Sequence, residues 1–352
     1  MVSLKWNRVA YLLIAILAIA GCNIHEVAPD VNHISVHSRF IEYDEAFLKL
    51  NPEDDLAPKI ESLRDSFPAI TDLYIDNVMS FRKRGDTTDL YLTEIQGFLE
   101  SELVQDLKVT VDSVFPSMAS FNQDFTKAFQ YLKFYFPEYP TPNIYYLIDE
   151  YSYACFLFPD DGRDAVGISL DMFLGSQYPY KQLFPTNPAF SEYLTKTFDP
   201  AYMTKKGVSA IVEDLVGYDV GPQMIDHMIL NGKNQYILEK IFPQFPDTIL
   251  WEYTHEQMKW VKDNELNIYA YLLSENLLFS TDIQKYQKFV NASPNSPGMP
   301  EEAPGRTANY IGYKIVQAYM ENAANASLID LISNQNTQSI LATARYKPDL
   351  KQ

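Results

Sequence analysis

Residues 207–232, GVSAIVEDLVGYDVGPQMIDHMILNG, contain two helical patterns in succession and form the centre of the predicted fold. In the first, apolar residues recur at the i, i+3, i+4, i+7, i+8 spacing of a helix with one buried face: Val208, Ile211, Val212, Leu215 and Val216. Gly207 precedes this stripe, and Gly217 and Gly221-Pro222 end the predicted helix. A second helical run extends from Gln223 to Asn231-Gly232.

In register, the two helices resemble the active-site helix and the following third-ligand helix of zincin metallopeptidases. Zincins bind zinc through His-Glu-x-x-His, because imidazoles at i and i+4 share one helical face and the glutamate activates a metal-bound water. The aligned residues here are Val212-Glu213-Asp214-Leu215-Val216. Valine has no lone pair for a metal, so the pattern predicts a degenerate zincin-like domain without catalysis. An ordinary buried helix with two acidic residues on its exposed side is the alternative interpretation.

The composition is that of an acidic globular protein. The chain has 352 residues, of which 47% are hydrophobic and 21% charged, and its formal charge is −18. Residues 1–21 contain Lys5 and Arg8 and no acidic residue, so their removal changes the charge to −20. Such a surface argues against a nucleic-acid partner, which requires clustered lysine and arginine.

The N-terminus has the pattern of a bacterial lipoprotein signal. Lys5 and Arg8 precede an uncharged apolar segment, residues 9–21, which is shorter than the about 20 residues needed to span a membrane. The segment ends in Ile19-Ala20-Gly21-Cys22, which resembles a lipobox. The pattern predicts a signal peptide over 1–21, a diacylglyceryl thioether on Cys22 that anchors the chain to a membrane, and a tether over 22–32. No disulfide is expected, because Cys155 then has no partner.

The remaining chain predicts an α-rich α+β fold in which a small mixed or antiparallel sheet packs on helices. Helices are expected over residues 58–81, 90–107, 120–136, 201–206, 254–280, 282–291 and 306–322. Strands are expected over residues 33–40, 143–149, 153–158 and 165–173. Residues 293–306 contain four prolines and predict an irregular loop. Residues 33–352 are expected to form a single globular domain, with an N-terminal helical lobe over 33–135 and the sheet and central helices over 143–352.

Residues that could carry chemistry are few. The five histidines do not supply three ligands for a metal with an open coordination position, so neither a metal nor a cofactor is predicted. No G-x-S-x-G, Walker or G-x-G-x-x-G motif is present. A weak acidic site, formed by His227 and Asp226 with Glu213 or Asp214, is weighed against an ordinary surface role. The candidate groove comprises Glu213, Asp214, His227, Arg306 and Tyr310.

The segment Pro304 to Met320, PGRTANYIGYKIVQAYM, is the most distinctive. It predicts a helix from Thr307 in which Gly312 costs about 1 kcal/mol relative to alanine, so another group is expected to approach its backbone closely. Arg306 is expected to pair with a carboxylate, either Glu213 or Glu275, as a structural ion pair or a substrate clamp.

Several segments together resemble the GldB-type gliding-motility lipoproteins of Bacteroidota. They follow Cys22 in order along the chain: HEVAPDV (25–31), RFIEYDEAF (39–47), FPAITDLYIDNV (67–78), IVEDLV (211–216), MILNGKNQYILEKIFP (228–243), YTHEQMKWVKDNELNIYAYLLSENLLFSTD (253–282) and PGRTANYIGYKIVQAYM (304–320). The resemblance implies a membrane-anchored component of gliding motility, a process tied to type IX secretion. It implies Cys22 as the lipid site and no catalytic residue.

The sequence therefore predicts a non-enzymatic protein of the cell envelope, anchored in the outer membrane and facing the periplasm, with envelope, gliding or secretion proteins as partners. Two other functions remain open. One is a metallohydrolase with ligands drawn from Glu213, Asp214, Asp226 and His227. The other is a binding module for peptidoglycan or exported peptides, which would use the cleft between the sheet edge and the 207–217 helix.

Overall fold

The computed structural model describes residues 28–85 and 87–348. The predicted signal peptide over 1–21, the predicted lipid site Cys22 and the first part of the predicted tether lie outside these residues. The chain divides into two compact units, residues 1–33 and 34–352, and the second contains all the elements of secondary structure that follow. Within the described ranges, no helix is both long and apolar enough to cross a membrane.

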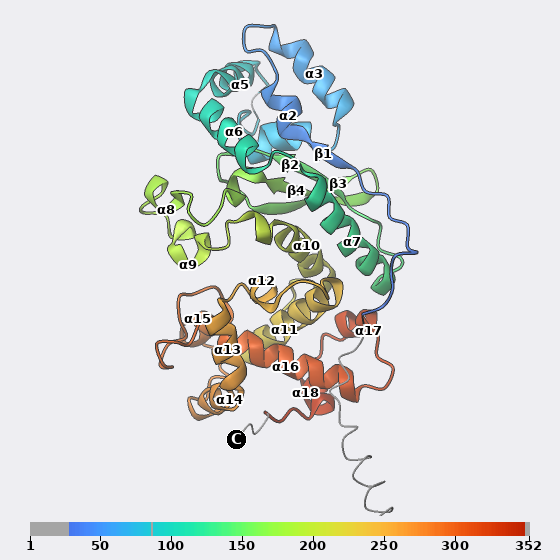
Figure 1. The fold of residues 1–352 in the computed structure, drawn as a ribbon, viewed down its shortest axis with the longest axis vertical. Coiled ribbons are helices and arrows are strands. Elements are labelled where there is room, and N and C mark those ends of the chain that lie inside the picture. Colours follow the sequence, from blue (N-terminus) through green and yellow to red (C-terminus); the bar gives the residue numbers. More distant parts are fainter. Residues whose placement is uncertain (1–27, 86, 349–352) are drawn as a thin grey trace, which may run out of the picture. The chain divides into compact units, whose positions relative to one another are not determined.

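A four-stranded mixed sheet lies at the centre of the second unit (Figure 1). Its order is β1 (Phe40–Glu42), β2 (Asn143–Leu147), β4 (Arg163–Ser169) and β3 (Cys155–Asp160). Strands β1, β2 and β4 are parallel, and β3 is the antiparallel edge. The three later strands were predicted close to these positions. The strand expected over 33–40 is limited to residues 40–42, because the N–H of Arg39 donates to the side chain of Asn143 (2.9 Å) and the ladder stops there.

One face of the sheet is covered by N-terminal helices. Tyr145, Leu147, Phe158 and Ala165 join a hydrophobic cluster with side chains of this helical layer. Its elements are α2 (Tyr43–Leu48), α3 (Leu56–Ser66), α4 (Thr71–Leu73), the π-helical turn η1 (Tyr74–Val78), α5 (Leu90–Glu100) and α6 (Glu102–Val114). The single helix expected over 58–81 is interrupted at Phe67, because Pro68 disfavours helical backbone in the residue before it. The helix expected over 90–107 is interrupted at Ser101, whose backbone is extended.

Helices α7 (Ala119–Tyr135) and α10 (Pro200–Val216) lie on the other face of the sheet (Figure 1). Helix α10 is longer than predicted and includes residues 201–206, because the side chain of Asp199 caps its N-terminus and Pro200 occupies its first turn. Gly207 therefore lies inside the helix and does not begin it. A Cβ atom at Gly207 would lie 3.0 Å from the Phe125 ring and 3.3 Å from Ile168, so the glycine allows α10 to pack closely.

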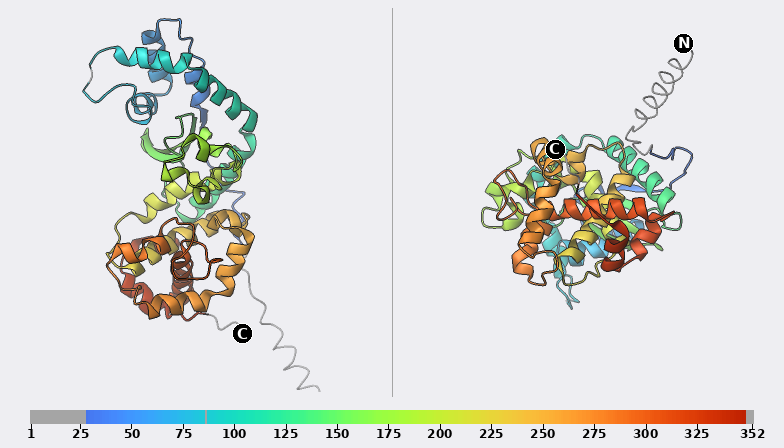
Figure 2. Two further views of the ribbon diagram at one scale, coloured as in Figure 1. Left: turned by 90° about the vertical axis from the view of Figure 1, so that its left-hand side faces the viewer. Right: turned by 90° about the horizontal axis from the view of Figure 1, so that it is seen from below.

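The C-terminal part is helical. Helix α11 (Met224–Ile241) continues through Gly232, where the sequence predicted its end, and lies against α16 (Thr307–Asn322), as the yellow and red helices show in Figure 2. The helix expected over 254–280 is divided at Asn264 into α13 (His255–Asp263) and α14 (Glu265–Ser274). The other elements of residues 170–348 are η2 (Leu170–Phe173), α8 (Tyr180–Leu183), η3 (Pro188–Phe190), α9 (Glu192–Thr195), α12 (Asp247–Trp251), α15 (Ile283–Val290), α17 (Leu328–Ser333) and α18 (Thr337–Ala344). The predicted α-rich α+β class is confirmed, and the zincin-like relationship stays a prediction.

Three buried carboxyl groups should make the stability of this fold depend on pH. Burial raises the pKa of Asp44 to about 7 and that of Asp149 to about 6, and it holds the pKa of Asp171 well above its usual range. Asp149 and Asp171 are fully buried, close to each other beyond the ends of β2 and β4. Since unfolding returns each pKa to about 3.9, the folded state binds more protons between the two values.

Stability should therefore increase as the pH falls. Between pH 7.5 and 5.5 we expect Asp44 alone to raise the free energy of unfolding by about 2 kcal/mol, because each proton bound only in the folded state contributes about 1.4 kcal/mol per pH unit, and Asp149 and Asp171 should add to this rise. Urea unfolding across this range measures the slope. Asp44→Asn should make the dependence of stability on pH less steep, since the asparagine amide does not titrate. A wild-type stability that falls with pH would contradict the prediction.

Candidate functional site

An ionic cluster forms where three distant segments meet, and Glu252 is its centre. Lys205 of α10 donates to Oε1 of Glu252 (2.9 Å), and Nζ of Lys206 lies 3.4 Å from the same oxygen. Arg306, directly before α16, donates from Nη1 to Oε2 of Glu252 (3.3 Å) and from Nη2 to the carbonyl of Trp251 (3.2 Å). One carboxylate thus holds three cationic side chains, and only 14% of its surface is exposed.

Backbone strain accompanies this cluster. Glu252 ends α12 at φ +55°, and Arg306 begins α16 at φ +63°, so two paired residues are both left-handed although neither is glycine. This conformation is uncommon for residues with a Cβ atom and costs on the order of 1 kcal/mol each. The two segments are tied together by the Tyr253 hydroxyl, which donates to the carbonyl of Gly305 (2.6 Å). The ion pair and this bond hold both residues in place.

The charges of the cluster shift the pKa values of Glu252 and Lys196. Burial alone would raise the pKa of Glu252, but the charges of Lys205, Lys206 and Arg306 outweigh it and hold the pKa well below its usual range. Burial lowers the pKa of Lys196, and the nearby charge of Arg306 lowers it further. Glu252 is therefore ionised at neutral pH. The charged form of Lys196 is disfavoured by burial and by Arg306, and an added negative charge would stabilise it.

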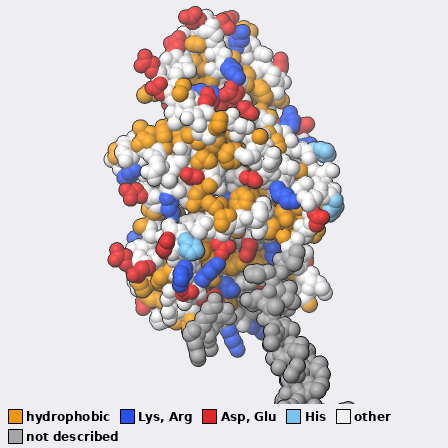
Figure 3. Space-filling view, in the orientation of Figure 1, with side chains coloured by type: hydrophobic (Ala, Val, Ile, Leu, Met, Phe, Trp, Pro, Cys, Tyr) orange, Lys and Arg blue, Asp and Glu red, His pale blue; other side chains and the backbone are white. Residues whose placement is uncertain are grey.

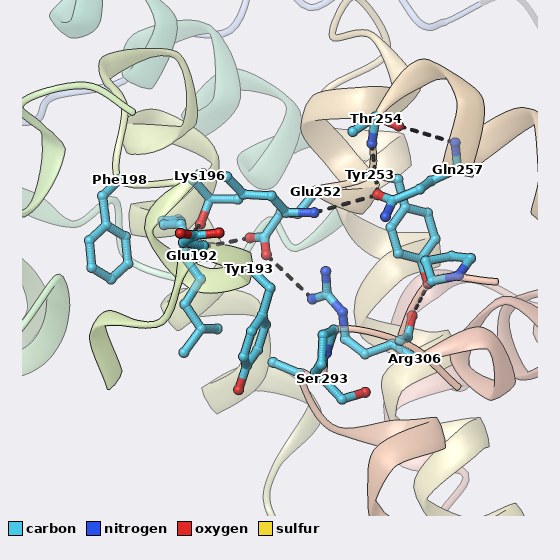
Figure 4. Close-up of a pocket in the computed structure, with 17 residues that line it drawn as sticks. Glu192, Tyr193, Lys196, Phe198, Glu252, Tyr253, Thr254, Gln257, Ser293 and Arg306 are labelled. Carbon is cyan, nitrogen blue, oxygen red and sulfur yellow. Dashed lines mark hydrogen bonds and ion pairs between the residues drawn. The ribbon is translucent and has the colours of Figure 1, made fainter. Parts of the chain in front are cut away.

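A cavity of about 350 Å³ opens beside the cluster (Figure 4). Figure 4 shows Arg306 directed toward Glu252, and Lys196 reaching toward Gln257, whose Oε1 lies 3.5 Å from Nζ. The lining combines charged, polar and apolar side chains: Glu192, Tyr193, Leu194, Lys196, Thr197, Phe198, Lys206, Glu252, Tyr253, Thr254, Gln257, Ala292, Ser293, Pro294, Pro304, Gly305 and Arg306. Its volume is at the lower end of the about 300–1,000 Å³ typical of small-molecule sites. The proline-rich loop predicted over 293–306 forms part of the wall.

The residues of the predicted groove do not all come together here. Of the five, Arg306 alone is among the residues that line this cavity. Glu213 and Asp214 are exposed near the end of α10, and His227 packs on Tyr286 at a ring distance of 5.6 Å. Tyr310 is buried, with its ring 5.4 Å from that of Trp251.

The partner predicted for Arg306 was wrong. The sequence suggested Glu213 or Glu275, and the structure pairs Arg306 with Glu252. The left-handed turn at the end of α12 brings Glu252 to Arg306. No periodic pattern in the sequence predicts such a turn. The predicted close approach to Gly312 is confirmed, since a Cβ atom there would lie 1.9 Å from the carbonyl oxygen of Met228.

The two positions that hold zinc in zincins face the interior. Val212 is fully buried and Val216 is 2% exposed, whereas Glu213 between them is exposed. Within residues 28–85 and 87–348, no three histidine, cysteine, aspartate or glutamate side chains are grouped as metal ligands would be.

Five charged residues of the site were not predicted from the sequence: Glu192, Lys196, Lys205, Lys206 and Glu252. One signal was available for Lys205, which precedes Val208 by three residues and Val212 by seven and so shares their buried face. A lysine on an apolar helix face requires a buried anionic partner. Lys196 and Glu252 lie in short irregular elements and carried no such signal.

Comparison with known proteins places the chain beside a described family. The family model described as gliding motility protein GldB matches residues 25–348. No curated protein matches the chain significantly. No solved structure matches the chain significantly either.

Proposed function

The chain belongs to the gliding motility protein GldB family, and from this premise we propose that it is a lipid-anchored, non-catalytic protein of the cell envelope. In this role it supports gliding motility and the associated type IX secretion machinery through contacts with other envelope proteins. The anchor is a diacylglyceryl group on Cys22, and the protein faces the periplasm from the outer membrane.

The observation that carries this proposal is the position of the family match. It begins at residue 25, three residues after Cys22 of the lipobox Ile19-Ala20-Gly21-Cys22, and continues to residue 348. A globular chain whose family-specific part starts beside a lipid site is suited to work at a membrane surface.

The geometry of α10 supports a non-catalytic role. Zinc hydrolysis on a zincin helix needs two imidazoles on one face and a glutamate beside the metal. Here both ligand positions are valines that point into the core, so the helix face that would hold a metal is occupied by packing. Glu213 alone does not make such a site.

Complementation of a deletion strain of the host tests both the anchoring role of Cys22 and the absence of a catalytic role for Glu213. We expect Cys22→Ala to release the protein from the membrane fraction and to abolish gliding or type IX secretion, because the anchor places the chain at its partners. Glu213→Gln should preserve localisation and function, since Glu213 is exposed and is assigned no chemistry here. Normal function of an unanchored Cys22→Ala protein would refute the anchoring role. Loss of function in a stable, membrane-bound Glu213→Gln protein would favour the metallohydrolase instead.

A further inference from the structure

The cavity beside Glu252 has a positive charge surplus in a chain whose net charge is −18. Lys196, Lys206 and Arg306 line it, against the carboxylates of Glu192 and Glu252. Lys205, directly behind Glu252, adds a further cation. Acidic side chains are spread over the face of the molecule in Figure 3, so a local concentration of cations is unusual here.

This surplus is not neutralised by the cluster itself. Glu252 is shared among Lys205, Lys206 and Arg306, so it compensates one of their three charges. Lys196 has no carboxylate within ion-pair distance among the residues that the structure describes, and its contact in the cavity is the amide oxygen of Gln257. An anion in the cavity would therefore satisfy charges that the protein leaves open.

The rest of the lining limits the kind of anion. Tyr193, Leu194, Phe198, Pro294 and Pro304 give the cavity an apolar side. At the N-terminus of α13, the N–H groups of Thr254 and Gln257 are paired in a capping box, in which the two residues exchange hydrogen bonds (3.1 and 3.2 Å). The charged donors that line the cavity are the side chains of Lys196, Lys206 and Arg306. Such cations suit a carboxylate, and the apolar side of the cavity suits an apolar group attached to that carboxylate.

We propose that this cavity binds the terminal carboxylate of a peptide, with Lys196, Lys206 and Arg306 holding the carboxylate and the last side chain lying on the apolar wall. The ligand could come from the C-terminus of an exported protein or from the stem peptide of the cell wall, since both present the same group. This inference goes beyond the anchoring role and does not depend on it, because binding can be measured without a membrane or a motile cell.

Isothermal titration of the full chain in detergent tests the proposal. The probe is N-acetyl-Ala-Ala-Leu with a free carboxylate, and its matched control is the same peptide with a C-terminal amide. We expect the amide to bind at least tenfold more weakly, because it lacks the charge that the lysines recognise. Equal binding of both peptides, or binding of neither the probe nor a stem peptide ending in D-alanine, would overturn the proposal.

Variants locate the binding in the cavity. Lys196→Met and Lys206→Met retain most of the apolar stem of the side chain and remove its charge. Each substitution should lower the affinity for the peptide with the free carboxylate at least fivefold. The control Lys259→Met removes an exposed lysine of α13 that pairs with Asp263, and it should leave binding unchanged. Preserved circular dichroism separates loss of binding from loss of folding, and unchanged affinity in both pocket variants would refute the site.

Two further ligands complete the test. Preference for the stem peptide ending in D-alanine would assign the site to the cell wall, and preference for the L-peptide would assign it to an exported protein. Either result supports a carboxylate site. Full displacement of the peptide by an equal concentration of inorganic phosphate would show a general anion site and would contradict the proposal.

Discussion

Replacement of Gly312 by alanine is expected to lower the free energy of unfolding by about 3 kcal/mol or more. A Cβ atom at this position would lie 1.9 Å from the carbonyl oxygen of Met228 and 2.5 Å from its carbonyl carbon, so the collision is with backbone. Across the same crossing, a Cβ atom at Gly232 would lie 2.4 Å from the carbonyl carbon of Gly312. Helices α11 and α16 therefore touch backbone to backbone, and an added methyl group must force them apart. Thermal or urea unfolding measures the loss.

A second glycine provides the control for this prediction. Gly97 lies in the exposed interior of α5, and a Cβ atom there would meet nothing within 4 Å. Gly97→Ala should raise the free energy of unfolding by about 0.5–1 kcal/mol, because alanine loses less backbone entropy in a helix. If both substitutions stabilise the protein, the close crossing of α11 and α16 is wrong.

Replacement of Glu252 by glutamine is expected to cost about 3–5 kcal/mol. The change removes the carboxylate on which Lys205, Lys206 and Arg306 converge and leaves their charges facing one another in a largely buried space. It also releases the ion pair that holds the left-handed residues at the two helix ends. We expect a lower midpoint of urea unfolding, with the loss reduced at high salt because the repulsion of the remaining cations is screened.

The matched control for Glu252 is Glu302→Gln, which makes the same chemical change in the nearby proline-rich loop. Glu302 is exposed, and the described residues include no ion-pair partner for it. Its substitution should leave stability unchanged within error. A Glu252→Gln protein as stable as the wild type would show that the cluster contributes nothing to the fold, and it would weaken the assignment of the cavity as a preformed anion site.

The helices and strands with a clear hydrophobic period could be predicted from the order of the residues alone. Of the stripe predicted to be buried, Val208, Ile211, Val212 and Val216 are buried in α10 and Leu215 is half-buried. The 3.6-residue period of a helix follows directly from the order of its residues, so this face could be predicted. The three later strands and the helices over 119–135, 283–290 and 307–322 followed in the same way. Membership of the GldB family was likewise predicted from short segments that follow one another in a fixed order, and the family match confirms it.

The contacts between residues far apart in the chain could not be predicted in this way. Gly207 and Gly232 read as helix ends, and they are helix interiors, because their role is to admit Phe125 and the backbone of α16. Glu252 lies 47 residues from Lys205 and 54 from Arg306, and a left-handed turn brings it to both. Local pattern carries no information about such contacts, since they depend on how separate helices are placed around the sheet. The cavity and its charges therefore became visible only in the folded chain.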